Sequence, residues 1–486
     1  MSFLTLGFAA VGAAVLLGWL IHLERTDRPE IAVLLVFAVV VLEVVLYPVQ
    51  TEIPSGVFHL GGGSTSFRTL DGLIPIALLA RLIVRRTPRA IGAPALWWVA
   101  FCFWILVGMY AGPSGSTQAA FFAKHGWLSF DPVLPRYQAK EIIYLGGAYA
   151  LAAGVPMIAY IRRQGVLQRL LMPAGALATV VFLTTMVGQS FSISLPGLKG
   201  ATIGDPGADT ASAFVVLAML ALTFGSARVA RRPWLVAFCL PLTLSVALAE
   251  QRAAFIGILA SYGLLLVVLF SSNAKRRLIS RPTEGFLVFM AIAAMVLIST
   301  LGPVMIGQRD ELQLPFHERI NSTFTGKGKS ESAADRRLIW KAAEEAIKQR
   351  PAFGWGLGRR IRAYRTGYYD FTLYPDMHNI YLDLLLRRGL VGLGLFLMAV
   401  ALSLRDGWRV WRFHPDSRVA AMAIGAIAGI MGLLGKGLVE SIFEKYRLAI
   451  LLGLLLGMLR SARTSLTDDE WSRHPERLPE PIAIEG

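Results

Sequence analysis

The chain has 486 residues, of which 55% are hydrophobic and 16% are charged, well below the roughly 25% charged residues of a typical soluble domain. Apolar stretches of about 20 residues recur from end to end, which excludes one large soluble core and predicts a polytopic membrane protein. The net charge of +16 does not indicate nucleic-acid binding, because the basic residues form small clusters between apolar stretches. We therefore expect an all-α transmembrane helical bundle.

About thirteen apolar segments have the length of membrane-spanning helices. Basic residues cluster after the odd-numbered segments, so the positive-inside rule predicts an N-terminus outside and a C-terminus in the cytoplasm. The first segment has no preceding basic residue and no small-residue cleavage site, which favours a retained helix over a signal peptide. The segments lie near residues 2–22, 29–48, 69–84, 93–112, 141–161, 166–187, 209–227, 233–250, 252–271, 284–306, 385–404, 417–437 and 445–460.

Three long connections fall on the predicted outer side, near residues 113–140, 190–210 and 307–384. The third is long enough that we expect it to carry function. The predicted organisation is therefore helices 1–10 in residues 1–306, a partly helical periplasmic loop in 307–384, helices 11–13 in 385–460, and a disordered cytoplasmic tail in 461–486. No internal repeat is visible, so an inverted-repeat transporter gains no support.

An amphipathic helix is predicted inside the third loop. Ser332 and Asp335 resemble a capping box at its start, and Pro351 should end it. Arg336 falls inside the apolar arc, where a charge needs a partner or a ligand. A structural ion pair at the membrane surface and an anion site both remain open. The apolar stripe comprises Leu338, Ile339, Ala342, Ala343, Ala346 and Ile347, and the opposite face comprises Arg337, Lys341, Glu344 and Lys348.

Gly354, Gly356 and Gly358 follow this helix. They do not form a dinucleotide fingerprint, because a helix and a proline precede them where a strand is required. The glycines indicate either a tight return toward the membrane, with backbone free to approach a ligand, or a plain turn. The aromatic residues of GYYDFTLYPDMHN come next and could be interfacial anchors or face sugar rings.

His378 and Asn379 stand at the mouth of the next apolar segment. Asp376 is predicted to cap the helix there, which would favour a neutral imidazole and attract phosphate. The alternative is an interfacial histidine bonded to a backbone carbonyl. Arg252 lies at an outer turn between two apolar segments, where an ionisable residue indicates function. A surface pair with Glu250 is the alternative for Arg252.

Taken together, these residues resemble the O-antigen ligase and O-antigen polymerase family, bacterial membrane glycosyltransferases that use polyprenyl-diphosphate-linked glycans. The stronger block is Arg336, Trp340 four residues later, then PAFGWGLG, the His-Asn pair and RRGLVGLGLFL. The weaker block, AEQRAAFIGIL, is similar to a Ser-Arg-Gly motif of which only Arg252 matches. Arg387 stands where relatives often carry an acidic residue.

The resemblance implies that a glycan moves from undecaprenyl diphosphate to an acceptor hydroxyl at the outer face of the bacterial cytoplasmic membrane. The displacement would be inverting and independent of metal or cofactor. The implied partners are a lipid-linked glycan donor, a glycan or lipid acceptor and membrane lipids, with no nucleic acid. The resemblance implies His378 as general base, Arg252, Arg336 and Arg337 as diphosphate-binding residues, and supporting roles for Trp340, Gly354, Gly356, Gly358 and Asn379.

Two questions stay open at the level of sequence. Ligase and polymerase break the same bond and differ in the acceptor, so these residues do not separate them. A polysaccharide or lipid transporter or flippase is the alternative from another class. It would be expected to bury charges within its spans, whereas this chain concentrates polar residues in one outer loop.

Overall fold

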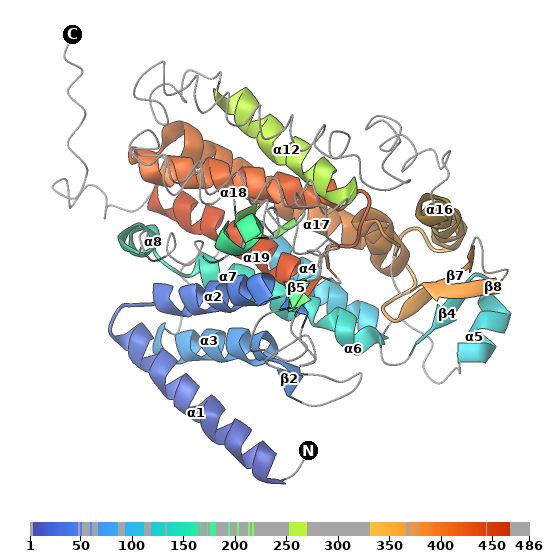
Figure 1. Cartoon of the computed structure of the whole chain (residues 1–486), viewed down its shortest axis with the longest axis horizontal. Coiled ribbons are helices and arrows are strands. Elements are labelled where there is room, and N and C mark those ends of the chain that lie inside the picture. Colours follow the sequence, from blue (N-terminus) through green and yellow to red (C-terminus); the bar gives the residue numbers. More distant parts are fainter. Residues whose placement is uncertain are drawn as a thin grey trace.

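The computed structural model of the chain describes residues 3–46, 49–50, 59–60, 67–85, 93–110, 118–131, 134–163, 166, 173, 175–180, 193–194, 202–203, 212–213, 216–217, 252–269, 331–365, 370–374, 377–443 and 445–466. These residues are mostly helical (Figure 1). The helices are α1 (Phe3–Arg25), α2 (Glu30–Leu46), α3 (Thr69–Arg85), α4 (Ala93–Tyr110), α5 (Gln118–His125), α6 (Leu134–Ala139), the π-helix η1 (Ile142–Gly147), α7 (Ala148–Ala153), α8 (Met157–Arg162), α12 (Arg252–Leu269), α16 (Glu331–Gln349), α17 (Ile380–Phe413), α18 (Ser417–Lys436) and α19 (Tyr446–Ser465). The strands are β1 (Val49–Gln50), β2 (His59–Leu60), β3 (Phe67–Arg68), β4 (Leu128–Phe130), β5 (Ile193–Ser194), β6 (Thr202–Ile203), β7 (Arg359–Arg365) and β8 (Asp370–Tyr374).

Three of the described helices, α17, α18 and α19, are long and apolar enough to cross a membrane, judged by length and composition. Other helices expose large apolar side chains, such as Val15 on α1, Phe103 on α4 and Val267 on α12. Lipid solvates such side chains, whereas a soluble surface rarely carries many of them together. The full set of thirteen spans stays a prediction, because the predicted eighth and tenth segments lie outside the described residues.

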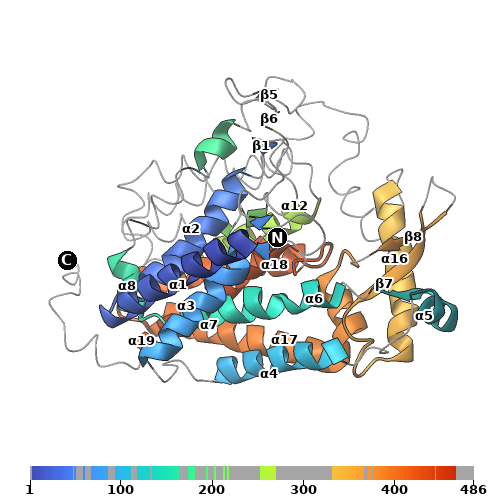
Figure 2. The same cartoon turned by 90° about the horizontal axis from the view of Figure 1, so that it is seen from below.

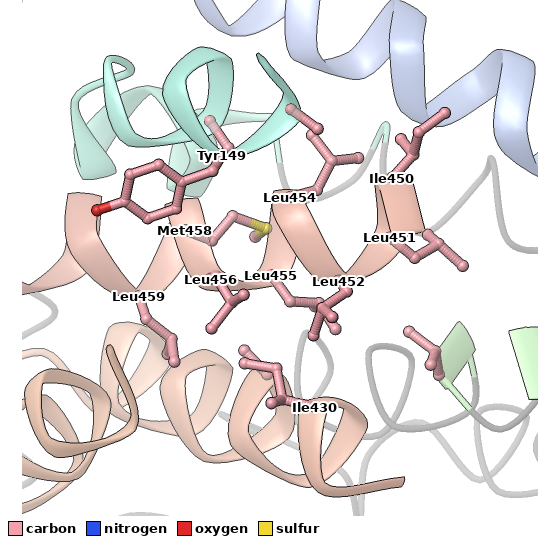
Figure 3. Packing of buried hydrophobic residues seen from close by; sticks show 14 of the residues in the cluster. Tyr149, Ile430, Ile450, Leu451, Leu452, Leu454, Leu455, Leu456, Met458 and Leu459 are labelled. Carbon is pink, nitrogen blue, oxygen red and sulfur yellow. The ribbon is translucent and has the colours of Figure 1, made fainter. Parts of the chain in front are cut away.

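Helix α19 is buried in the centre of the bundle. Figure 3 shows its leucines directed both toward Tyr149 of α7 and toward Ile430 of α18. Two glycines let the neighbouring backbone come close. A Cβ on Gly453 would lie 2.5 Å from the carbonyl oxygen of Leu145, and one on Gly457 would lie 2.4 Å from that of Tyr149. Small residues four apart are a common means of close packing between membrane helices.

The predicted fifth span, residues 141–161, is interrupted instead of continuous. The helix of η1 and α7 ends at Ala153, and α8 begins at Met157 after a turn that contains Pro156. Side chains bond the carbonyls that the break leaves open. Arg81 donates from Nη1 to the carbonyl oxygen of Leu151 at 2.6 Å, and Tyr160 donates from its hydroxyl to that of Ala152 at 2.9 Å. Because the tertiary structure satisfies the open backbone groups, the break is tolerated.

A three-stranded antiparallel sheet, in the order β4-β7-β8, lies beyond the ends of α4 and α17 (Figures 1 and 2). Leu128 of β4 pairs with Ile361 of β7, which pairs in turn with Tyr374 of β8. Strand β4 comes from the first long connection, and β7 and β8 come from the third. Helix α16 packs on this sheet and buries Ile339 and Ala343 completely. We call α5, β4, α16, β7 and β8 the sheet layer.

Helix α16 agrees with the predicted amphipathic helix. It begins at Glu331 and ends at Gln349, two residues before Pro351. The six residues of the predicted apolar stripe are buried or half-buried, and the four charged residues opposite are exposed. The strands that follow it were not predicted.

The C-terminal boundary differs from the prediction. Helix α19 continues to Ser465, so the first residues of the predicted tail are helical. Ser461 and Ala462 are fully buried, and this packing extends the helix beyond the apolar run. Residues 467–486, the rest of the predicted tail, lie outside the described residues.

Candidate functional site

Helix α17 begins directly after Asn379, whose side chain caps it. The Oδ1 atom accepts hydrogen bonds from the backbone N–H groups of Tyr381 at 2.9 Å and Leu382 at 3.0 Å. The Nδ2 atom donates to the carbonyl oxygen of Leu438 at 2.8 Å. The cap is therefore Asn379 and not the predicted Asp376, which lies outside the described residues. An asparagine satisfies the open N–H groups of the first turn as well as an aspartate does.

His378 precedes this cap with a φ of 47°, in the left-handed region that residues other than glycine rarely adopt. Its side chain is half-buried. Such a backbone persists only where its surroundings impose it. Two hydrogen bonds flank His378. Trp340 donates from Nε1 to the carbonyl oxygen of Met377 at 2.8 Å, and the N–H of Ile380 donates to the carbonyl oxygen of Gly437 at 2.8 Å. The segment that carries His378 is thus fixed by α16 on one side and by the end of α18 on the other.

The bond from Trp340 also brings a face of α16 toward His378. Arg336 lies one helical turn before Trp340, so the two share a face of α16. Arg336 is half-buried, whereas Arg337 is exposed on the charged face. Of the two α16 arginines predicted to bind diphosphate, Arg336 is the one on the side of α16 that contacts the His378 segment.

Arg252 is the first residue of α12, and α12 packs antiparallel against α18. Ser261 donates from Oγ to the carbonyl oxygen of Ala428 at 2.9 Å. A Cβ on Gly257 would lie 3.9 Å from the Cβ of Lys436. The start of α12 therefore faces the C-terminal end of α18, where α17 also begins. Arg252 and His378 are therefore placed at the same end of the bundle. The alternative pairing of Arg252 with Glu250 is not tested, because Glu250 lies outside the described residues.

The glycine segment binds the backbone of α17. This helix bends at Gly389, which has a φ of 64° and a ψ of −171°. The bend leaves the carbonyl oxygens of Leu386 and Arg387 without their helical donors. Trp355 and Gly356 donate their backbone N–H groups to these oxygens at 2.8 and 2.9 Å. A bend in a helix requires such substitute partners.

The glycines are needed because the two backbones touch. A Cβ on Gly354 would lie 2.6 Å from the backbone nitrogen of Arg388. Gly354, Gly356 and Gly358 all have positive φ, between 72° and 83°. The predicted tight turn is confirmed. The backbone that it approaches is that of α17 and not that of a ligand. We call residues 351–358 together with the bend at Gly389 the glycine clamp.

Residues 235–397 match a protein family described as O-antigen ligase. The resemblance to the O-antigen ligase family is confirmed. The matched region covers about a third of the chain and includes Arg252, Arg336, His378 and the glycine clamp. No curated protein matches the chain. The match over residues 235–397, together with the apolar helices, is in keeping with a bacterial membrane protein that resembles O-antigen ligases in this region.

Two buried ion pairs lie next to the glycine clamp. One is formed entirely by residues of the matched region, and the other joins that region to Glu141. Arg387 contacts Asp383 at 2.6 Å, and both side chains are fully buried. Arg388 pairs with Glu141, and both are almost completely buried. Arg387 therefore has a carboxylate partner one turn earlier on its own helix. Pairing of this kind is required of charges buried in protein.

Lys436 is a buried cation near the site that sequence reasoning missed. Its side chain is fully buried, and its Nζ lies 3.2 Å from Oε2 of Glu440. Lys436 directly precedes Gly437, the residue that accepts the hydrogen bond from Ile380. The sequence feature that could have revealed this buried ion pair is a single lysine at the end of an apolar segment, followed four positions later by an acidic residue. Lys436 lies outside the matched region.

Candidate metal ligands do not cluster in the described ranges. No group of three or more His, Cys, Asp or Glu side chains there is placed to hold a metal ion. Cys102 is a half-buried free thiol. Cys239 lies outside the described residues.

Proposed function

We propose that the chain is a membrane glycosyltransferase of the O-antigen ligase or polysaccharide polymerase type. It moves a glycan from undecaprenyl diphosphate to an acceptor hydroxyl at the outer face of the bacterial cytoplasmic membrane. The observation that carries the proposal is the hydrogen bond from Trp340 to Met377. This bond joins the helix of Arg336 to the segment of His378 inside the O-antigen ligase region.

The proposed topology is multi-pass, with the site on the periplasmic side and the C-terminus in the cytoplasm. Ten helices in residues 1–306 and three in 385–460 flank a periplasmic loop in 307–384. Strands β4 and β7 pair in one sheet, which supports a topology in which the first and third long connections lie on the same side of the membrane. The start of α12 and the start of α17 at one end of the bundle support the same arrangement.

In the proposed reaction, the acceptor hydroxyl attacks the anomeric carbon of the donor glycan. The bond from that carbon to the diphosphate oxygen breaks, and polyprenyl diphosphate leaves with the electron pair. His378 takes the proton of the hydroxyl as general base. The single displacement inverts the anomeric centre and uses no metal.

Negative charge grows on the leaving diphosphate during this step. Arg252 and Arg336 are proposed to bind it through charge-assisted hydrogen bonds, with Arg337 at the exposed edge. Trp340 and Asn379 are proposed to hold the histidine segment in place through the hydrogen bonds described above.

The test is transfer of a labelled lipid-linked glycan in membranes that contain the His378→Ala variant. We expect transfer to fall by roughly 10²–10⁴-fold, the usual contribution of a general base, with unchanged abundance and unfolding behaviour. His22→Ala, at an exposed histidine near the end of α1, is the matched control and should transfer normally. A folded His378→Ala protein with wild-type transfer would show that the catalytic assignment is wrong.

Glycan analysis of a strain that lacks the protein separates the two acceptors. Intact lipid-linked polymer that is no longer attached indicates a ligase, and a single repeat unit left on the lipid indicates a polymerase. Purified protein in liposomes that moves the lipid-linked glycan across the bilayer without forming a transfer product would instead support a flippase.

A further inference from the structure

One face of the sheet layer concentrates positive charge. Residues 350–365 contain five arginines and no Asp or Glu, and residues 118–131 add Lys124 with Asp131 as the single carboxylate. Asp131 is already paired with Arg360. The layer therefore keeps a strong positive excess in the part of the chain that carries β4 and β7.

The alternation along β7 divides these arginines between the two faces of the sheet. Ile361 and Ala363 are buried toward α16. Residues at odd and even positions of a strand point to opposite faces, so Arg360 and Arg362 lie on the face away from α16. The guanidinium of Arg362 lies 4.4 Å from the centre of the Phe122 ring of α5. We call this face, with Phe122, Trp127, Arg360 and Arg362, the basic face.

Behind the basic face lies a further cation that is fully enclosed. Arg359 donates from Nε to the carbonyl oxygen of Trp355 at 2.9 Å, and its guanidinium lies over the rings of Phe121 and Phe130 at 4.7 and 4.5 Å. Its two Nη atoms have no hydrogen-bond partner among the described residues. Because no carboxylate neutralises it there, its charge adds to the positive potential of the layer.

His125, beside Lys124, responds to this potential. Burial first, and then the charges of Lys124, Arg350 and Arg359, lower the pKa of His125 below its ordinary value. Three separate cations thus act on one imidazole, which packs against Phe121 and Trp355, in agreement with the excess of positive charge in the sequence.

An exposed aromatic ring accompanies the charges. Trp127 is 46% exposed, and its carbonyl oxygen accepts the backbone N–H of Arg362 at 2.9 Å. A tryptophan ring offers a flat apolar surface to the C–H face of a sugar while arginine forks bind carboxylate or phosphate groups. This combination fits a charged saccharide better than it fits a simple ion.

The position of the basic face argues against acyl chains as its ligand. The glycine clamp lies at the level of the helix ends, where Leu357 donates its N–H to the carbonyl oxygen of Gly108 on α4 at 2.9 Å. Exposed apolar residues Phe353 and Leu390 lie at this level. Strands β4 and β7 continue away from it, beyond the ends of α4 and α17 in both views (Figures 1 and 2). A ligand of the basic face is therefore the polar part of a molecule.

We propose that the basic face binds an anionic glycan chain, one whose sugars carry carboxylate or phosphate groups, and holds it at the end of the bundle where His378 lies. This inference rests on the proposed function, because it names the class of glycan that the enzyme handles. Arg360 and Arg362 bind the acidic groups, and Trp127 packs against the sugar rings.

The test is direct binding by the full-length protein in neutral detergent micelles. The probe is a hexamer of galacturonic acid, and the uncharged comparison is maltohexaose. We expect the acidic hexamer to bind with a strong dependence on salt and maltohexaose not to bind. The variants Arg362→Gln and Trp127→Ala should each weaken binding about tenfold, the loss expected for one charge-assisted or stacking contact.

The matched control is Lys341→Gln/Lys348→Gln, which removes two exposed positive charges from α16 and should leave binding unchanged. Equal binding of the two hexamers, or equal weakening by the control, would overturn the proposal. A third outcome would also overturn it. If a basic-face variant still binds the hexamer but no longer binds nanodiscs of anionic phosphatidylglycerol, the ligand of this face is a membrane surface. Binding is measured without transfer, so His378→Ala should retain it, and a failure of the proposed transfer activity would not be mistaken for a failure of this inference.

Discussion

The bend at Gly389 allows the glycine clamp to be tested by a single methyl group. The φ and ψ of Gly389 lie in a region that is essentially limited to glycine, so alanine there costs about 2 kcal/mol. The new Cβ would lie 2.2 Å from the carbonyl oxygen of Ala352, a backbone atom that no side-chain rotation can move. If residues 351–352 move away from the new methyl group, two backbone hydrogen bonds break. These are the bond from the N–H of Leu390 to the carbonyl oxygen of Pro351 at 2.8 Å and the bond from the N–H of Val391 to that of Ala352 at 3.1 Å. Each bond contributes about 1 kcal/mol, so Gly389→Ala should lower the free energy of unfolding by about 4 kcal/mol.

The measurement is unfolding of the purified protein by SDS titration in mixed micelles, followed by tryptophan fluorescence. Gly394→Ala is the matched control on the same helix, since a Cβ there meets no atom within 4 Å. Alanine at that position should leave stability unchanged or raise it by about 0.5–1 kcal/mol through its better helix propensity. If Gly389→Ala and Gly394→Ala unfold at the same SDS fraction, the reasoning about the clamp is refuted.

Three further predictions use other contacts. Asn379→Ala should cost about 1–2 kcal/mol through loss of the helix cap, measured by the same titration, and Asn379→Asp, which keeps the accepting oxygen, should recover part of it. Arg388→Ala leaves Glu141 buried without its partner and should cost about 3–5 kcal/mol, whereas the double variant Glu141→Gln/Arg388→Met should recover most of this, and additive losses would contradict a direct interaction. Because the fold lowers the pKa of His125, the unfolded chain binds a proton more readily, so this histidine contributes stability above its ordinary pKa of 6.5 that is lost as pH falls through the lower, folded value. Protection of the α5 amides against hydrogen exchange, measured relative to the intrinsic rate at each pH, should therefore fall below about pH 6.5 in the wild type but not in His125→Phe, and an equal fall in both would exclude this histidine as the cause.

Much of the site was predictable because its signals are local. The 3.6-residue period of α16 determines which of its residues are buried, and Pro351 limits its length. The helix start at His378 and Asn379 was also predictable, although Asp376 was predicted as its cap and Asn379 is the residue that caps it. The glycine spacing indicated a tight return, because positive φ is a property of a single residue and its backbone.

Contacts between distant segments were not predictable from these patterns. Strands β4 and β7 are separated by more than two hundred residues, and β4 has three residues, too few for a period to be visible. The break before α8 depends on Arg81 and Tyr160, which supply the missing hydrogen bonds from elsewhere. Lys436 ends an apolar segment, and one lysine hardly changes the mean hydropathy of such a segment. Its pairing with Glu440 is visible only in the folded chain.

Hydropathy and residue period were enough to predict a helical membrane protein, the buried face of α16, and a histidine and arginines near helix starts. These properties follow from hydropathy and backbone preference within a few turns of chain. Three contacts became visible only in the folded chain: Trp340 bonds the His378 segment, the glycines contact α17, and Arg362 of β7 meets Phe122 of α5. Each of these depends on the distance between atoms far apart in sequence, which packing of the whole bundle sets and no local period encodes.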